Sequence, residues 1–128
     1  MHVEHVAMRL VLMRELPAIL LFAFGCDLFT PNLHVVVRNG TSGEIDHAIV
    51  TFADRDIHIG ALPSGAHSSY GPIVTDVPVD ATLSWQTADG RQHTQRVKVK
   101  SQIRENRSGD VVFTIVDADR VEVSFDRP

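Results

Sequence analysis

Histidine is the residue type in this chain with the widest chemistry, because a neutral imidazole binds metals and titrates near neutral pH. Five of the seven histidines follow residue 30, at positions 34, 47, 58, 67 and 93. None of these pairs has the His-x-His spacing of a metal site on a strand or the His-x3-His spacing of one on a helix. His58 and His67 flank the Leu62-Pro63 turn, so they could approach each other. We expect no metal site, and His58 and His67 are the weak candidates for one.

The other motifs for catalysis and ion binding are incomplete. Asp54-Arg55-Asp56 has the beginning of a calcium loop, but His58 and Ile59 occupy the places where that loop needs an oxygen ligand and a glycine. Ser64, His67, Ser68 and Ser69 lie close together in the sequence, but no Gly-x-Ser-x-Gly elbow surrounds a serine. No glycine-rich phosphate loop occurs. We therefore expect a protein that is not an enzyme and needs no cofactor.

The composition narrows the class of protein further. The chain has 128 residues, enough for one domain and not for two. Its 12 Lys plus Arg against 16 Asp plus Glu give a net charge of −4, so it lacks the charge of a nucleic-acid-binding protein. A hydrophobic content of 44% excludes a chain that is disordered by composition. The single cysteine excludes an internal disulfide and a thiolate zinc site.

The first 26 residues have the organisation of a secretory signal. Two arginines, Arg9 and Arg14, precede an apolar run from Leu16 to Gly25, and the only cysteine, Cys26, follows it directly. The run has ten residues, whereas a helix needs about 20 residues to span a bilayer. A basic stretch, a short apolar core and a small residue before a break are typical of a cleaved signal peptide. Translation from Met8 instead of Met1 would give a more ordinary signal, and the true start is open.

Ala23-Phe24-Gly25-Cys26 resembles the lipobox of bacterial lipoproteins. In that family the cysteine thiol receives a diacylglyceryl group, the signal is cut before the cysteine, and the new amino terminus is acylated. Gly25 and Cys26 match the pattern, whereas Ala23 replaces the usual Leu and Phe24 the usual small residue. The resemblance implies cleavage between Gly25 and Cys26 and lipidation of Cys26. A plain cleaved signal, an uncleaved anchor and a buried N-terminal helix are the alternatives.

The lipobox resemblance also implies where the protein lies and how it is organised. Several acyl chains together anchor a protein durably, whereas one alone binds membranes only marginally. We expect a signal peptide over residues 1–25, a lipidated tether over 26–32 and a folded domain over 33–128. The resemblance implies a protein anchored by lipid in the cell membrane, with its domain on the periplasmic or extracytoplasmic side.

From Leu33 onward the apolar residues alternate with polar ones, which predicts strands instead of helices. Turn residues recur about every ten positions, as in all-β sandwiches and barrels. We expect a single antiparallel β-sandwich of seven or eight strands, preceded by the apolar signal helix. It resembles immunoglobulin-like or transthyretin-like sandwiches, without the Cys, Trp, Cys spacing of true immunoglobulin domains. The predicted strands cover residues 33–39, 45–53, 56–61, 66–73, 79–87, 91–100, 110–116 and 120–126.

The register of two hairpins can be predicted by requiring that apolar residues pair with apolar residues. A three-residue loop of Ala88-Asp89-Gly90 pairs Ala81 with Val97 and Val79 with Val99, and it places Gly90 in the left-handed conformation. His93 then lies opposite Trp85. A three-residue loop of Asp117-Ala118-Asp119 likewise pairs Ile115 with Val121, Phe113 with Val123 and Val111 with Phe125.

These registers predict the core and leave a candidate surface. Val112 and Val116 lie on the second face of an otherwise inward strand, which indicates a central strand or a covered face. We name Tyr70, Val112, Val116 and the 101–109 loop as the candidate interaction surface. The predicted core comprises Val35, Val37, Ile49, Val50, Phe52, Ile57, Ile59, Leu83, Trp85, Val97, Val99, Val111, Phe113, Ile115, Val121, Val123 and Phe125.

Taken together, the sequence predicts a membrane-anchored lipoprotein that acts as a non-enzymatic binding or interaction module in the cell envelope. Its partners would be the membrane, through the lipid anchor, and an unidentified envelope protein. An alternative is a structural or regulatory component of a larger envelope complex, and a weaker one is a histidine-dependent metal-binding domain. The cations between residues 96 and 107 suit either a membrane surface or an acidic partner, or simply a solvated edge strand.

Overall fold

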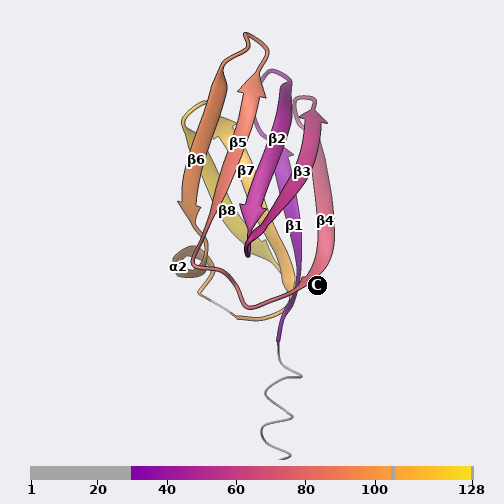
Figure 1. The fold of residues 1–128 in the computed structure, drawn as a ribbon, viewed down its shortest axis with the longest axis vertical. Coiled ribbons are helices and arrows are strands. Elements are labelled where there is room, and N and C mark those ends of the chain that lie inside the picture. The colour runs from indigo at the N-terminus through magenta and orange to yellow at the C-terminus, as the bar shows by residue number, and fades with distance from the viewer. Residues whose placement is uncertain (1–29, 105, 128) are drawn as a thin grey trace, which may run out of the picture. The chain divides into compact units, whose positions relative to one another are not determined.

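A computed structural model describes residues 30–104 and 106–127, which form eight strands and one short helix (Figure 1). The eight strands agree with the prediction to within two residues at each end. The elements are β1 (Asn32–Asn39), β2 (Ile45–Phe52), β3 (Arg55–Leu62), β4 (His67–Val74), β5 (Asp80–Thr87), β6 (Gln92–Lys98), α2 (Lys100–Ile103), β7 (Gly109–Asp117) and β8 (Arg120–Asp126).

The strands form two four-stranded sheets that pack as a sandwich. The first sheet has the order β4-β1-β7-β8 and the second has the order β3-β2-β5-β6. The prediction of a wholly antiparallel sandwich is wrong at one place, since β1 and β7 pair in parallel. Consecutive strands alternate in direction, so two odd-numbered strands that lie side by side must be parallel. In the constant-type immunoglobulin order the first two strands share a sheet, whereas here β1 and β2 lie in different sheets.

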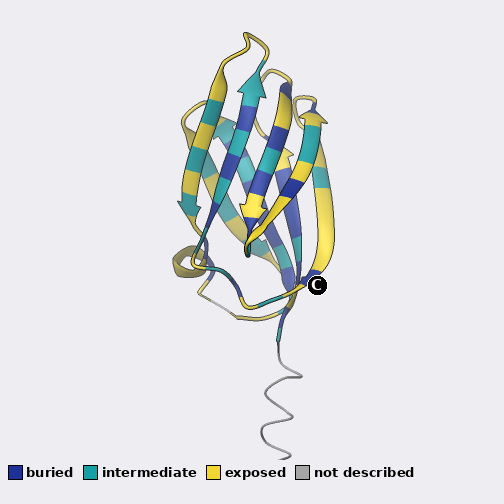
Figure 2. Cartoon of the chain, viewed as in Figure 1, coloured by how far each residue is buried: buried dark blue, intermediate teal, exposed yellow. Residues whose placement is uncertain are grey.

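The core lies between the two sheets, where side chains from their inner faces meet (Figure 2). Phe52 from the second sheet meets Phe113 from the first edge-to-face, with ring centroids 6.2 Å apart. Most predicted core residues are buried, and five others pack against the cluster partly buried. Those five are Ile59, Val97, Val121, Val123 and Phe125. Buried residues that the alternation missed include Leu33, Ile45, Leu62, Ile73 and Val77.

The prediction that Ile49 belongs to the core is wrong, and a bulge in β2 explains why. His47 has a φ of +52°, and the pairing of β2 shifts there against both neighbouring strands. One extra residue in a strand turns every later side chain to the opposite face. Ala48 and Val50 therefore point inward, and Ile49 between them is only half buried.

Both predicted registers are confirmed. In the β5–β6 pair, Ala81 lies opposite Val97 and Trp85 opposite His93. The Thr87 amide donates to the Arg91 carbonyl over 3.0 Å, so the loop is the three-residue one, and Gly90 has a φ of +87°. Val79, which was expected to share the inner face of β5, precedes the strand and is 68% exposed.

The β7–β8 pair has its predicted register, but its loop is shorter than predicted. Ile115 pairs with Val121 and Phe113 with Val123, as expected. Asp117 then pairs with Arg120, and the register shifts between Ile115 and Asp117. The loop itself is therefore two residues long, and a bulge at Val116 supplies the extra residue that the register requires.

Helix α2 was not predicted, because a single turn with one inward residue shows no helical period. Ile103 is 8% exposed and fastens the turn to the core. The apolar helix expected before the domain, the signal residues and the tether with Cys26 lie outside the described residues. In the described part of the chain, no helix is long or apolar enough to cross a membrane.

The sandwich has two distinct ends (Figure 1). We call "entry end" the end where β1 begins, which also carries the 53–54 turn, the 75–79 loop and residues 99–108. At this end the Thr75 amide donates to the Pro31 carbonyl over 3.1 Å, and the Asn32 amide donates to Ser108 Oγ over 2.9 Å. We call "loop end" the opposite end, which carries residues 40–44, 63–66, 88–91 and 118–119.

Candidate binding site at the loop end

Three of the four connections at the loop end line an open pocket of about 480 Å³, and a hollow of similar size, about 470 Å³, lies at the entry end. The β1–β2 loop crosses from the first sheet to the second, whereas the β5–β6 and β7–β8 turns each join neighbouring strands of one sheet, so the pocket lies across the open end of the sandwich. Its lining comes from the β1–β2 loop, from the end of β5 with its hairpin, and from the end of β7 with its turn. The lining residues are Gly40, Thr41, Ser42, Gly43, Glu44, Trp85, Thr87, Ala88, Asp89, Val116, Asp117 and Ala118.

The buried side chain of Asn39 holds two of the loops at this end together. Its Nδ2 donates to the Gly43 carbonyl over 2.8 Å and to the Leu62 carbonyl over 2.9 Å. Its Oδ1 accepts from the Thr41 amide over 2.9 Å and from the Thr41 hydroxyl over 2.6 Å. The side chain therefore uses both its donor hydrogens and both acceptor positions. The β1–β2 loop is fixed in shape as a result.

The backbone of Asn39 also forms hydrogen bonds with the 63–66 loop. The Asn39 amide donates to the Ala66 carbonyl over 2.9 Å, and the Gly65 amide donates to the Asn39 carbonyl over 2.8 Å. Asn39-Gly40-Thr41 also spells a glycosylation pattern. Because Asn39 is 0% exposed and its Nδ2 is engaged twice, that nitrogen is not available to a glycan.

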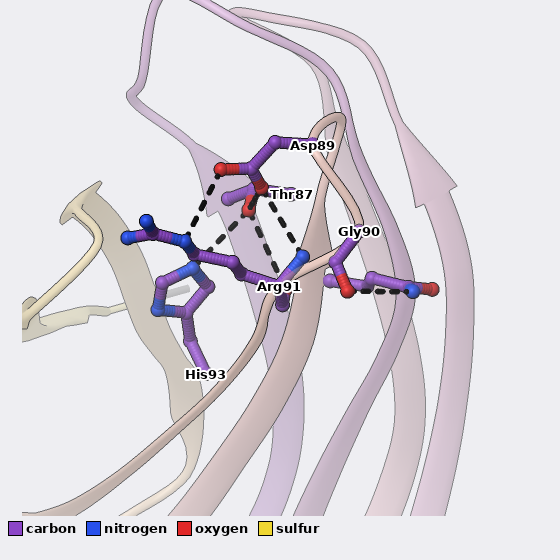
Figure 3. A network of polar contacts seen from close by, with 6 residues as sticks. Thr87, Asp89, Gly90, Arg91 and His93 are labelled. Atoms are coloured by element: carbon purple, nitrogen blue, oxygen red, sulfur yellow. Dashed lines mark hydrogen bonds and ion pairs between the residues drawn. The ribbon is translucent and has the colours of Figure 1, made fainter.

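A polar network fixes the β5–β6 hairpin on the other side of the pocket (Figure 3). The Thr87 hydroxyl donates to Asp89 Oδ1 over 2.5 Å, and the Arg91 amide donates to the same oxygen over 3.1 Å. Together these two hydrogen bonds hold the pKa of Asp89 below its usual value, the Thr87 contact being the stronger cause. His93 Nε2 lies 3.2 Å from the Thr87 hydroxyl. Because that hydroxyl donates to Asp89, it can only accept from His93.

Trp85 lies beneath this network and forms part of the pocket wall. Its indole ring stacks on the His93 imidazole, with centroids 5.6 Å apart and planes at 24°. Trp85 is 0% exposed. Its Nε1 is the one buried side-chain nitrogen or oxygen of the described residues that lacks a hydrogen-bond partner. A buried N–H without an acceptor is costly.

Carboxylates dominate the rim of the pocket and the surface around it. Those at the loop end are Glu44, Asp46, Asp89, Asp117 and Asp119, all of them exposed. The cations there are fewer, namely Arg38, Arg91 and Arg120, and Arg91 already lies 3.6 Å from Asp89. A second hollow of about 390 Å³ adjoins the pocket and shares Glu44, Thr87 and Ala88 with it. This charge pattern disfavours anions and favours a neutral or positively charged ligand.

The structure does not bring the two candidate metal-binding histidines together. His58 lies on β3 of the second sheet opposite Ile49, and His67 lies on β4 of the first sheet opposite Arg38. Their inward neighbours are Ile57 and Ser68, so the two imidazoles project from opposite outer faces of the sandwich. Among the described residues, no group of three or more His, Cys, Asp or Glu side chains could hold a metal ion.

The candidate interaction residues do not form one surface. Tyr70 is 44% exposed on the edge strand β4. Val112 is 2% exposed in the central strand β7, paired with Val36 and Ser124. The central position was predicted, but burial makes Val112 unsuitable as a contact residue. Val116 lies at the loop end and lines the pocket, whereas residues 101–109 belong to the entry end.

Comparison with known proteins shows the fold and nothing more. No protein-family model matches the chain, and no curated protein is significantly similar to it. It is similar to the NMR structure of a protein from Eubacterium rectale, with 17% sequence identity and a TM-score of 0.54. The similarity covers 76% of this chain and 90% of the other. At this identity the likeness supports the sandwich architecture alone.

Asn39→Ala should lower the free energy of unfolding by about 2–4 kcal/mol, because it leaves the Thr41 amide and the Gly43 and Leu62 carbonyls without their partner. Chemical denaturation measures this value. The control is Ser124→Ala at an exposed position of β8, where a change below about 0.5 kcal/mol is expected. Equal midpoints for both variants would mean that Asn39 does not stabilise the loop end.

Thr87→Val should raise the pKa of Asp89 towards its usual value, because it removes the strongest hydrogen bond to the ionised carboxyl. A folded-state pKa below the unfolded one means that ionised Asp89 stabilises the hairpin above the usual pKa. That contribution is lost as the pH falls through the lowered value. The carboxyl carbon chemical shift, followed by NMR against pH, reports it. Thr94→Val, on exposed β6, is the control, and identical Asp89 titrations in Thr87→Val and wild type would contradict the assignment.

Proposed function

We propose that this protein is a lipid-anchored component of the bacterial cell envelope, and that its sandwich domain is a non-enzymatic binding module. The observation that carries the proposal is the position of the pocket. It lies at the loop end, opposite the end where the chain enters the domain (Figure 1). A domain tethered at one end offers its opposite end to partners, so a pocket there is well placed for binding.

The length of the tether supports this arrangement. Cys26 precedes Pro31 by five residues, and five residues span at most about 18 Å in any conformation. With a lipid on Cys26, the entry end stays within that distance of the membrane surface. A strand of eight residues is about 26 Å long, so the loop end lies roughly that far from the entry end.

The side chains around the pocket favour binding over catalysis. Thr87 and His93 resemble a nucleophile and its base, with 3.2 Å between the hydroxyl and Nε2. The Thr87 proton, however, is donated to Asp89 over 2.5 Å, so the imidazole is not placed to remove it. The ionised Asp89 is itself engaged by the Arg91 amide. These contacts give the hairpin a fixed shape, which is what a binding surface needs.

The lipid anchor is tested by the intact mass of the protein from the membrane fraction of a bacterial host. We expect a species that starts at Cys26 and carries diacylglyceryl and acyl mass. Cys26→Ser should leave an unprocessed precursor, because the modified thiol is lost. Ser42→Cys, which places a cysteine outside the signal, should be processed normally. A species that starts elsewhere without lipid mass contradicts the anchor and leaves an unassigned β-sandwich.

The binding site is tested by photo-crosslinking in the same cells. A benzophenone amino acid at Ser42, on the rim of the pocket, should crosslink to a defined envelope protein. The same group at Ser124, on the exposed face of β8, should not. Gly43→Trp should abolish the crosslink by filling the pocket, since Gly43 lines the pocket and a Cβ added there meets no atom within 4 Å. The same crosslinks at positions 42 and 124, or a crosslinked product that persists in Gly43→Trp, would show that the pocket is not the binding site.

A further inference from the structure

The entry end carries exposed apolar and cationic side chains that take no part in the binding proposed for the loop end. Val74 is 67% exposed and Val79 is 68% exposed, the highest values among the large hydrophobic residues of the described chain. Lys98, Lys100 and Arg104, at the end of β6 and around α2, are exposed at the same end. We define these five residues as the entry-end surface.

Hydrogen bonds show that Val79 adjoins the cations, whereas Val74 lies on β4, at the opposite edge of the first sheet from β8. The Val79 carbonyl accepts from the Val99 amide over 2.9 Å and from the Lys100 amide over 3.3 Å, so Val79 lies directly against the beginning of α2. Val74 pairs with Asn32, where the chain enters β1. Ile103 fastens α2 to the core, which leaves the flanking Lys100 and Arg104 side chains directed to the outside.

The three cations are not neutralised by neighbouring carboxylates. Within the described residues, Lys98, Lys100 and Arg104 form no ion pair, and Arg104 Nε donates only to the Ser101 carbonyl over 3.4 Å. Two of the nearby carboxylates are already engaged, whereas the exposed Glu122 lines a hollow together with Lys98. Asp80 pairs with Arg96, with 2.9 Å between the charged atoms, and Asp76 accepts from Asn106 Nδ2 over 3.1 Å. Asp54, in the 53–54 turn at the same end, is exposed and lines one hollow together with Asp76, Val79 and Asp80.

Carboxylates lie at both ends of the domain, but the cations around α2 belong to the entry end alone. The loop end carries five exposed carboxylates, from Glu44 to Asp119, as described above. The entry end carries exposed carboxylates too, at Asp54, Asp56, Asp76 and Asp126, and at its α2 corner three cations that form no ion pair with another described residue. In front of a negatively charged surface, such a domain is attracted at the α2 corner and repelled at the loop end. Cationic residues beside exposed apolar ones are the composition of a segment that binds at a membrane interface.

We propose that the entry-end surface contacts the anionic phospholipid headgroups of the membrane to which the protein is anchored. Lys98, Lys100 and Arg104 bind the phosphates, and Val79 and Val74 meet the boundary of the acyl region. This inference rests on the proposed lipid anchor, because the tether keeps this end within reach of the bilayer. The contact gives the domain a fixed orientation, with the pocket facing away from the membrane.

The test uses the full chain, purified in detergent and reconstituted into vesicles of phosphatidylcholine alone or of phosphatidylcholine mixed with phosphatidylglycerol. Ser101→Cys, on the exposed side of α2, carries a fluorophore, and spin-labelled headgroups in the bilayer quench it. We expect about twofold stronger quenching in the anionic vesicles, because basic residues are attracted to an anionic surface. The effect should vanish at about 1 M salt, where the Debye length is about 3 Å.

Two controls separate the surface from general effects. A fluorophore on Ser42→Cys, at the loop end, should be quenched equally weakly in both kinds of vesicle. The triple variant Lys98→Gln/Lys100→Gln/Arg104→Gln should lose the difference at position 101. The matched variant Arg38→Gln/Arg91→Gln/Arg120→Gln changes the net charge by the same amount, but at the loop end. It should keep the difference in quenching at position 101. Thermal unfolding of both variants shows that each is folded.

The outcomes distinguish the two proposals. The intact mass of each reconstituted sample reports whether Cys26 carries lipid, and a mass without lipid overturns the anchor whatever the quenching shows. A lipidated chain with equal quenching at position 101 in both vesicles overturns the membrane-contact inference and leaves the anchor standing. Quenching that depends on anionic lipid and survives in the Lys98/Lys100/Arg104 variant also overturns it, because other residues would then make the contact.

Discussion

The four hydrogen bonds of the Asn39 side chain are the constraint on which the organisation of the loop end depends. β1 and β2 belong to different sheets, so the loop between them receives no support from a hairpin ladder. Asn39 supplies that support from the last residue of β1 and also binds the Leu62 carbonyl at the end of β3. One buried amide thus joins the two sheets where the hydrophobic core ends, and the pocket takes its shape from that junction.

The strands and their local pairing could be predicted from the sequence, because alternation and turn residues are local properties. The Ala81–Val97 and Phe113–Val123 pairs were correct, since an inward residue excludes every register but one. Two features were beyond such reasoning. The bulge at His47 turns Ile49 outward, and no glycine in β2 indicates that a bulge occurs there. The parallel pairing of β1 with β7 joins segments more than seventy residues apart, and no local pattern encodes it.

The candidate site was predictable only in fragments. Asn39-Gly40, Asp89-Gly90 and Asp117-Ala118-Asp119 were each recognised as turns, and Val116 was named as a candidate contact residue. That three of these turns meet around one pocket follows from the alternating direction of the strands, which sends the first, fifth and seventh strands towards the same end. Histidines drew attention because of their chemistry, yet of these only His93 lies near the pocket, and there it packs on Trp85.

The parallel pairing of β1 and β7 also has a mechanical consequence. β1 lies between β4 and β7 and is paired with both along most of its length. If the chain is held upstream of Pro31 and a bound partner pulls on the loop end, the tension runs along the axis of β1. The hydrogen bonds on both sides of that strand are then sheared together instead of opening one after another. The domain therefore bears such a load through a strand that is hydrogen-bonded on both sides.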